Sequence, residues 1–286
     1  MKLINLIENE RYFRYIVELD DGNIIEFSDN TRTNRQKHWV ICVPTQIGCP
    51  VGCFMCGSWK IPYKRSLTAE EIIDLVNFAV KKQKLNPGDS KNFTISFLGI
   101  GEPAFNIKNL EKALKILIKT YPCAKLIISS VGIKFNINSF LKLAVKYKAG
   151  LQFSLLNSNN TKRGKNVKPG LMNRLASLEM IANIGKKYYK ATGDKLYLDF
   201  LVKESDKENP KKVADELNNI FYPVDCFHIS INIGAKLGNS PQYLPPPREV
   251  AEKLFLHLQQ HGYEVTFHEP LGVDNGCGII TQTNHF

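Results

Sequence analysis

The order of apolar and amphipathic segments predicts an α/β fold, a partial (β/α)6 barrel with a small β-hairpin before it. Two observations support this prediction. Short apolar runs rich in β-branched residues alternate with amphipathic segments along most of the chain, which is typical of a parallel sheet with right-handed crossovers. In addition, a loop with three cysteines follows the first core run, at the strand end where α/β barrels place their chemistry. A flat doubly wound sheet has the same local pattern and stays an alternative at this point.

The first part of the chain reads as a hairpin. Two β-rich runs, residues 12–19 and 23–27, are joined by Asp20-Asp21-Gly22, a turn that tolerates positive φ. We therefore expect residues 1–37 to form a hairpin extension that caps the main domain. Residues 38–286 are expected to form the partial barrel with a C-terminal cysteine loop.

The rest of the chain alternates between strands and helices. The core strands are expected at residues 38–44, 92–98, 125–130, 151–155, 195–202, 225–232 and 263–268. The helices between them are expected at residues 68–82, 108–120, 139–148, 171–187, 210–220 and 248–261. The sequence Thr68-Ala69-Glu70-Glu71 is a capping box, which supports the start of the first helix.

Composition limits the class of protein. The 286 residues, 43% of them hydrophobic, are enough for one large α/β domain or two small ones. The N-terminus carries charges where a signal peptide needs an apolar core, and no apolar run is long enough to span a bilayer. Seven cysteines, an odd number with three clustered, do not suggest a disulfide framework. We expect a cytoplasmic protein without membrane contact, and we expect it to be a monomer.

The charge of the chain is compatible with a nucleic-acid partner. Lysine and arginine total 38 against 27 acidic residues, a formal net charge of +11 that attracts polyanions such as RNA. The alternative is that the same composition reflects codon bias toward lysine, asparagine and isoleucine. Five basic residues cluster after the fourth core strand, where a loop would lie at the mouth of the site: Lys162, Arg163, Lys165, Lys168 and Arg174. They could contact phosphates, or they could form a solvated loop.

The loop TQIGCPVGCFMCG contains Cys49, Cys53 and Cys56 with three and then two residues between them. Three thiolates at this spacing suit a [4Fe–4S] cluster with one iron left open for a small ligand. A structural zinc site would close with a fourth protein ligand, for which His38 or Cys42 is near in sequence. On spacing alone both metals remain open.

Several core strands end in small or hydrogen-bonding residues. The second strand ends in a glycine-rich segment with Gly101, Glu102 and Pro103, whose backbone can approach a ligand and whose carboxylate can accept bonds from an ammonium group. The other strand ends supply Ser129, Ser130, Ser154 and Asn232. Together they predict one polar ligand bound across the top of the sheet, although each of these residues is also common in turns.

Four segments and two further cysteines carry a family resemblance. The segments are CPVGCFMC, GIGEPAFN, ISSVGI and FSLLN; Cys42 lies seven residues before the first loop cysteine, and Cys277 lies in NGCGII. Together they resemble the radical S-adenosylmethionine RNA adenine methyltransferases of the RlmN/Cfr type over about residues 12–280. The resemblance implies a radical S-adenosylmethionine partial barrel, a [4Fe–4S] cluster, S-adenosyl-L-methionine as cofactor, and an electron donor such as flavodoxin or ferredoxin.

The resemblance also implies roles for individual residues. Cys49, Cys53 and Cys56 would bind the cluster. The cofactor would be contacted by residues at the strand ends, namely Gly101, Glu102, Pro103, Ser129, Ser130, Ser154 and Asn232. Cys277 would be methylated and would then carry a carbon radical to an adenine ring. Cys42 would deprotonate the covalent protein–RNA adduct and release the product through a disulfide bond with Cys277. Cys123 and Cys226 match nothing functional and are interpreted as core residues.

Departures from the family pattern leave the substrate open. The chain starts almost at the hairpin, so we expect it to lack the family's N-terminal helical domain. Ser154-Leu155-Leu156-Asn157 replaces a histidine-containing motif, the residues before Cys277 differ, and Ile279 replaces a glutamine. A structured rRNA, a tRNA or a smaller adenine-containing molecule are all possible substrates, at carbon 2 or carbon 8 of adenine. A radical enzyme with another substrate and a non-catalytic metal-binding RNA-binding protein are the alternatives.

Overall fold

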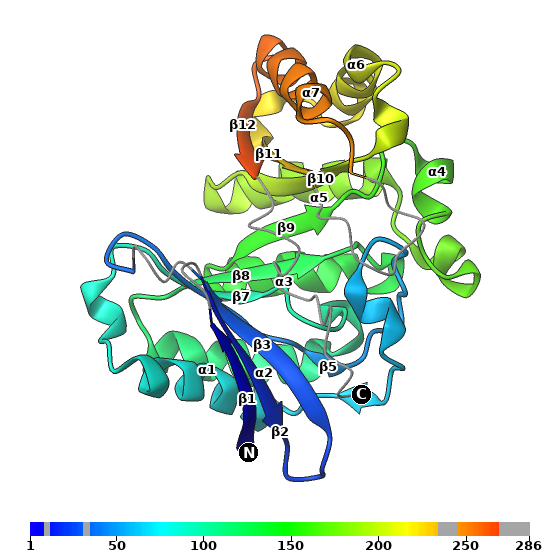
Figure 1. Ribbon diagram of the computed structural model, residues 1–286. Coiled ribbons are helices and arrows are strands. Elements are labelled where there is room, and N and C mark those ends of the chain that lie inside the picture. The colour runs from blue at the N-terminus through cyan, green and yellow to red at the C-terminus, as the bar shows by residue number, and fades with distance from the viewer. Residues whose placement is uncertain (9–11, 31–34, 234–244, 269–286) are drawn as a thin grey trace.

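A single ten-stranded sheet organises the molecule (Figure 1). The structure is a computed structural model that describes residues 1–8, 12–30, 35–233 and 245–268. Within these ranges the strand order is β1-β2-β3-β4-β7-β8-β9-β10-β11-β12, so neighbouring strands follow chain order throughout. A doubly wound sheet would reverse this order at a switch point. The predicted α/β fold with a parallel sheet and an N-terminal hairpin is therefore confirmed, and the doubly wound alternative is wrong.

The first strands of the sheet are antiparallel and the others are parallel. The antiparallel strands are β1 (Lys2–Glu8), β2 (Tyr12–Glu18) and β3 (Ile24–Asn30). The parallel strands are β4 (Trp39–Cys42), β7 (Phe93–Phe97), β8 (Lys125–Ser130), β9 (Gly150–Ser154), β10 (Leu196–Val202), β11 (Phe227–Ile233) and β12 (Glu264–His268). The short strands β5 (Gln46–Ile47) and β6 (Arg65–Ser66) pair separately.

The predicted hairpin corresponds to β2 and β3, and β1 is a further strand on its outer edge. The hairpin extends the main sheet, because β3 pairs with β4, with Ser28 opposite Cys42. The predicted division of the chain after residue 37 remains a prediction.

Helices follow most of the parallel strands, close to the predicted positions. They are α1 (Ala69–Gln83), α2 (Ile107–Thr120), α3 (Ile137–Tyr147), α4 (Asn160–Gly164), α5 (Leu178–Thr192), α6 (Pro210–Ile220) and α7 (Arg248–Gln260). The Thr68–Glu71 capping box forms as predicted. The helix predicted from residue 171 begins later, because Ser177 caps α5 and the preceding segment Pro169–Arg174 is a 3-10 helix. None of the helices in the described ranges is long and apolar enough to cross a bilayer.

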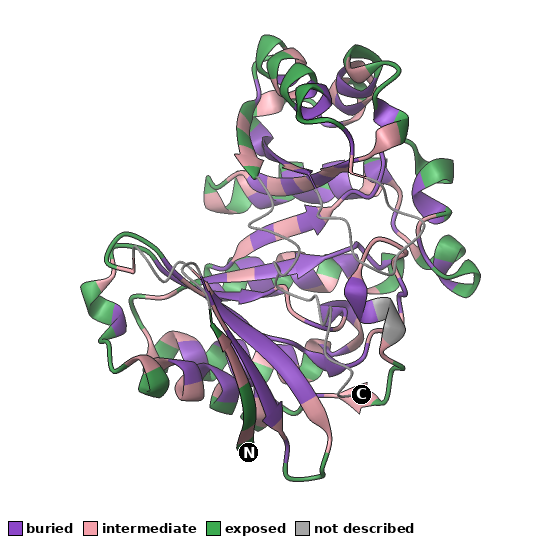
Figure 2. Ribbon diagram, in the orientation of Figure 1, coloured by how far each residue is buried: buried purple, intermediate pink, exposed green. Residues whose placement is uncertain are grey.

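One face of the sheet packs against helices, and most residues of the central strands are buried (Figure 2). Phe153 of β9 contacts Phe140 of α3, and Phe227 of β11 contacts Phe221 at the end of α6. Since successive side chains of a strand point to opposite faces, Ser154 and the polar residues of β11 point away from the helices. The interpretation of the two remaining cysteines is half correct: Cys226 is buried, but Cys123 is exposed because it lies in the turn between α2 and β8.

Candidate active site

The cysteine loop begins directly after β4, at the carboxyl end of the parallel sheet. Two glycines shape it: Gly48 has a φ of +72° and Gly52 a φ of +61°, and an added Cβ at either position would meet other atoms at less than 3.0 Å. Within the loop, the Cys56 N–H donates to the Cys53 carbonyl at 3.0 Å. The three cysteines are thus presented by a tight turn whose backbone conformation requires glycine.

The three loop cysteines form no disulfide bond and are partly buried. Burial, reinforced by the neighbouring Cys56, raises the pKa of Cys49 to about 12. Burial also raises the pKa of Cys53 well above its ordinary value, and both Cys56 and Cys49 add to that effect. The three side chains therefore lie within electrostatic reach of one another.

This arrangement fits a cluster held by three thiolates. The raised pKa values mean that the thiolates are costly to form in the free protein. Binding of an iron–sulfur cluster would stabilise the thiolate form of these ligands. In the described part of the chain, no three His, Cys, Asp or Glu side chains already form a metal-binding group, so binding must draw the sulfurs closer together. A zinc site closed by His38 or Cys42 is not preformed among these residues either.

Glu102 connects three strand ends around the cysteine loop. Its carboxylate accepts hydrogen bonds from Ser130 Oγ at 2.6 Å, from the Ala104 N–H at 2.9 Å and from the Val131 N–H at 2.9 Å. Its own N–H donates to Gln46 Oε1 at 2.9 Å. Burial raises the pKa of Glu102, and the bond from Ser130 opposes this. A carboxylate has about four acceptor positions, so Glu102 retains one for a ligand ammonium group.

Glycine is required where the end of β7 meets the cysteine loop. The Gly99 N–H donates to the Val43 carbonyl at 3.1 Å, and a Cβ on Gly99 would lie 2.6 Å from Pro44 N. Gly101 has a φ of +101°, and its Cβ would lie 2.6 Å from the Gln46 side chain. The neighbouring Pro103 is buried at the start of a 3-10 helix. The glycines therefore bring the glutamate segment against the loop, as predicted for a backbone that approaches a bound group.

The other predicted cofactor contacts lie at the carboxyl ends of their strands. Ser129 is buried, and its Oγ has no hydrogen-bond partner in the described residues. Ser130 is also buried, but its hydroxyl donates a hydrogen bond to Glu102 and so holds the Glu102 carboxylate in position. Ser154 and Asn232 are half-buried on the sheet face opposite the helices. An orphaned hydroxyl at this edge is an observation in favour of a polar ligand.

Sequence reasoning missed Asp199. Ser154 pairs with Asp199 on β10, and Asp199 pairs with Ser230 on β11, so a carboxyl group lies between two hydroxyl-bearing residues on the same face. Burial raises the pKa of Asp199 to about 6, and a hydrogen bond with Ser230 opposes this. The signal was present in the strand itself, where Asp199 interrupts an apolar pattern.

Cys42 is buried at the last position of β4, seven residues before Cys49. It pairs with Ser96 of β7, and Asn30 Nδ2 lies 3.5 Å from its sulfur. The structure therefore places Cys42 at the same strand end as the cysteine loop. Cys277, its predicted partner, lies outside the described residues, as does Ile279. The disulfide bond between Cys42 and Cys277 remains a prediction.

The basic segment after β9 touches the cysteine loop but is not uniformly exposed. Lys162, Lys165, Lys168 and Arg174 are exposed, as expected for phosphate contacts. Arg163 is only 1% exposed and cannot reach a phosphate at the surface. The prediction of a common phosphate-binding role was therefore wrong for Arg163, because its side chain turns inward to backbone carbonyls.

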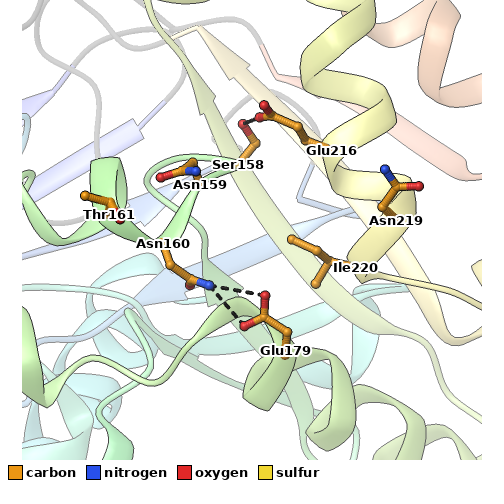
Figure 3. A pocket seen from close by; sticks show the side chains of 8 residues that line it. All are labelled: Ser158, Asn159, Asn160, Thr161, Glu179, Glu216, Asn219 and Ile220. Atoms are coloured by element: carbon orange, nitrogen blue, oxygen red, sulfur yellow. Dashed lines mark hydrogen bonds between the residues drawn. The ribbon is translucent and has the colours of Figure 1, made fainter.

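A polar pocket of about 300 Å³ lies beside this segment, between α4, α5 and α6 (Figure 3). Glu216 accepts a hydrogen bond from Ser158 Oγ at 2.6 Å, and Glu179 accepts two from Asn160 Nδ2 at 3.0 and 3.2 Å. Two carboxylates in one pocket repel anions. Phosphate contacts are therefore expected on the exposed lysines and not in this pocket.

Comparison with known proteins identifies relatives along nearly the whole chain. No family model matches. The probable dual-specificity RNA methyltransferase RlmN of Prochlorococcus marinus is 28% identical over 286 residues, which cover 97% of this chain and 78% of the relative. The protein of the same description from Pseudothermotoga lettingae is 33% identical over 217 residues, which cover 72% of this chain and 59% of the relative. The dual-specificity RNA methyltransferase RlmN of Campylobacter hominis is 26% identical and is covered to 77% of its length.

Solved structures agree in fold. A radical SAM methyltransferase from Sphaerobacter thermophilus superposes with a TM-score of 0.82 at 21% identity, covering 97% of this chain and 80% of that protein. A spore photoproduct lyase variant superposes with a TM-score of 0.57 at 13% identity, covering 80% and 76%. The first similarity extends over nearly all of the chain and therefore concerns the whole fold, including the parallel sheet. This chain belongs to the RlmN-like family of radical S-adenosylmethionine methyltransferases.

Proposed function

We propose that this enzyme methylates a ring carbon of adenine in RNA through a methyl-cysteine intermediate. The observation that carries the proposal is the shared position of Cys42 and the three-cysteine loop at the carboxyl end of β4. Carbons 2 and 8 of adenine are not nucleophilic, so ordinary polar methyl transfer to them is blocked and a radical route is needed. The relatives named as RNA methyltransferases support RNA as the substrate class.

The cofactors would be held by residues that converge on this edge. Cys49, Cys53 and Cys56 would bind a [4Fe–4S] cluster, and Glu102 would offer its remaining acceptor position to the ammonium group of S-adenosylmethionine. When bound, the two cofactors would supply the methyl group and the one-electron chemistry that activates it. Ser129 would donate its unpartnered hydroxyl to the nucleoside part.

The protein residues would carry the remaining steps. Cys277 would hold the methyl carbon on its sulfur and form the covalent bond to the adenine ring. After the radical adduct has given up one electron to a redox partner, Cys42 would take a proton from it. The Cys42 sulfur would then form a disulfide bond with Cys277 as the bond between the Cys277 sulfur and the transferred carbon breaks and the product leaves. The exposed Lys162, Lys165 and Lys168 would bind the phosphates next to the target base. A base in a flexible loop would be flipped out at lower cost than one in a helix.

An anaerobic assay tests the proposal. The full chain is reconstituted with iron and sulfide, incubated with S-adenosylmethionine, a reductant and unmodified RNA, and the RNA is digested to nucleosides for mass spectrometry. We expect a methyladenosine, whose chromatographic position distinguishes carbon 2 from carbon 8. Cys42→Ala should accumulate RNA covalently bound to the protein, whereas Cys226→Ala, which removes a buried thiol far along the chain, should behave as wild type.

Two other outcomes would direct the assignment elsewhere. Cleavage of S-adenosylmethionine without RNA methylation, and without a trapped adduct in the Cys42 variant, would favour a radical enzyme with another substrate. Failure to bind iron at all would leave an RNA-binding role only.

A further inference from the structure

Arg163 is a buried cation beside the cysteine loop. It lies in α4 with 1% exposure, and its Nη1 donates to the Ala176 carbonyl at 2.5 Å. Nη2 donates to the Val131 carbonyl, and Nε has no partner among the described residues. Burial lowers the pKa of Arg163 to about 10, and Cys53 and Glu102 oppose this, so both acidic groups lie within electrostatic reach of the guanidinium. At neutral pH the group stays charged.

The backbone after Arg163 is attached to the loop on both sides of Cys53. The Phe54 N–H donates to the Asn166 carbonyl at 3.0 Å, and the Lys168 N–H donates to the Val51 carbonyl at 3.2 Å. A Cβ on Gly52 would lie 2.5 Å from the Lys168 side chain, so that side chain passes directly over the loop. The position of Arg163 relative to Cys53 is therefore fixed by the fold and does not depend on a flexible contact.

Lys203 is a second cation near the same thiol. Its Nζ donates to Asn166 Oδ1 at 2.9 Å and to the Leu156 carbonyl. Burial lowers the pKa of Lys203 to about 8, while Asp206 and Cys53 oppose this. Asp206 partly neutralises Lys203, whereas both hydrogen bonds of Arg163 in the described residues go to neutral carbonyls. Arg163 is therefore the stronger source of positive potential at Cys53.

We propose that Arg163 is a positioning residue that sets the reduction potential of the iron–sulfur cluster, with Lys203 making a smaller contribution. This inference rests on the proposed cluster site. One-electron reduction adds negative charge to a cluster that is already bound by three thiolates. A fixed cation in a poorly solvated environment stabilises the reduced state more than the oxidised state and so raises the potential. The protein thereby makes the cluster easier for an electron donor to reduce.

The test compares charge with hydrogen bonding at residue 163. The midpoint potential of the reconstituted full chain is measured by anaerobic titration monitored by electron paramagnetic resonance, together with iron content. Arg163→Gln should make reduction about tenfold less favourable, which lowers the potential by about 59 mV for one electron. Arg163→Lys keeps the positive charge and should change the equilibrium constant for cluster reduction by less than about threefold. Lys190→Gln, which removes an exposed charge on α5 that has no role in the proposed site, is the control and should leave the midpoint potential unchanged.

An unshifted potential in Arg163→Gln, or an equal shift in Arg163→Lys, would overturn the inference. If Arg163→Gln does not retain iron, Lys203→Met decides, since it leaves both Arg163 carbonyl bonds in place. The Lys203→Met variant should bind as much iron as the wild type, and reduction of its cluster should be about threefold less favourable. A midpoint potential equal to that of the wild type would refute the electrostatic role. Wild-type protein that binds no iron would overturn the proposed function as well, whereas normal iron with unshifted potentials would overturn this inference alone.

Discussion

Replacement of Gly99 by alanine should damage the cysteine loop through the backbone of β4. The new Cβ would lie 2.6 Å from Pro44 N and from the Val43 carbonyl carbon, and 2.7 Å from the Val43 oxygen. All three are backbone atoms, so no side chain can rotate away. Ordinary contact begins at 3.4 Å, and the two segments must therefore separate by about 0.8 Å, the difference between 3.4 and 2.6 Å. The 3.1 Å hydrogen bond from the Gly99 N–H to Val43 would be strained or lost.

The cost follows from these two effects. Overpacking costs about 1–3 kcal/mol, and a lost backbone hydrogen bond costs about 1 kcal/mol. We expect Gly99→Ala to lower the free energy of unfolding in urea by about 2–4 kcal/mol. It should also lower the iron bound per chain after reconstitution, because Val43 and Pro44 lead directly into the loop. Gly170→Ala is the control, since a Cβ there meets nothing within 4 Å. Stability within about 0.5 kcal/mol of wild type would refute the steric argument.

Three further predictions concern buried charges and hydroxyls. Arg14 Nε and Glu26 Oε1 lie 3.5 Å apart and both side chains are buried, so above about pH 8, where Glu26 is ionised, Arg14→Met should lower the free energy of unfolding in urea by about 3–5 kcal/mol, and a simultaneous Glu26→Leu change should recover most of the loss. Burial raises the pKa of Glu26 to about 8 from an ordinary value of 4.5, opposed by Arg14. A folded pKa above the unfolded one means that stability is greatest below the unfolded pKa and falls as pH rises toward the folded pKa. The free energy of unfolding should therefore decrease between about pH 5 and pH 8, and Glu26→Gln should flatten that slope; an equal slope in the variant would contradict the assignment. Ser130→Ala removes the 2.6 Å bond to Glu102 and the 2.9 Å bond from the Gly132 N–H, and should cost about 1.5–3 kcal/mol, measured by urea unfolding.

Local signals predicted most of the fold. The capping box at Thr68 and the alternation of strands and helices depend on neighbouring residues, and the structure contains each of them close to the predicted bounds. Strand β1 was missed because its residues are mostly exposed, and its strand conformation depends on pairing with β2. The late start of α5 was missed because the apolar pattern extends through Pro169–Arg174, while the cap at Ser177 decides where the α-helix begins.

The candidate site also has features that the sequence predicts and one that it does not. Cysteine spacing and the glycine–glutamate–proline segment are contiguous in sequence, so their meeting at one sheet edge follows once the strands are placed. The burial of Arg163 does not follow from its own neighbourhood, which is lysine-rich and mostly exposed. It depends on carbonyls at Val131 and Ala176, which come from two other segments of the chain. A basic residue in a basic loop gives no sequence signal for such an inward turn.

The face of the sheet opposite the helices carries a row of polar residues and differs in this from a packed apolar core. Parallel strands covered on both faces are usually apolar on both. Here Ser154, Asp199, Ser230 and Thr266 form one row across β9 to β12, each paired with the next. Ser230 is buried, Ser154 and Asp199 are half-buried and Thr266 is exposed. Polar groups are costly to bury without partners, so apolar side chains could not cover this face at low cost. Its polarity therefore requires water or a polar ligand against it, and the cysteine loop, Glu102 and Cys42 lie at the carboxyl end of the same sheet.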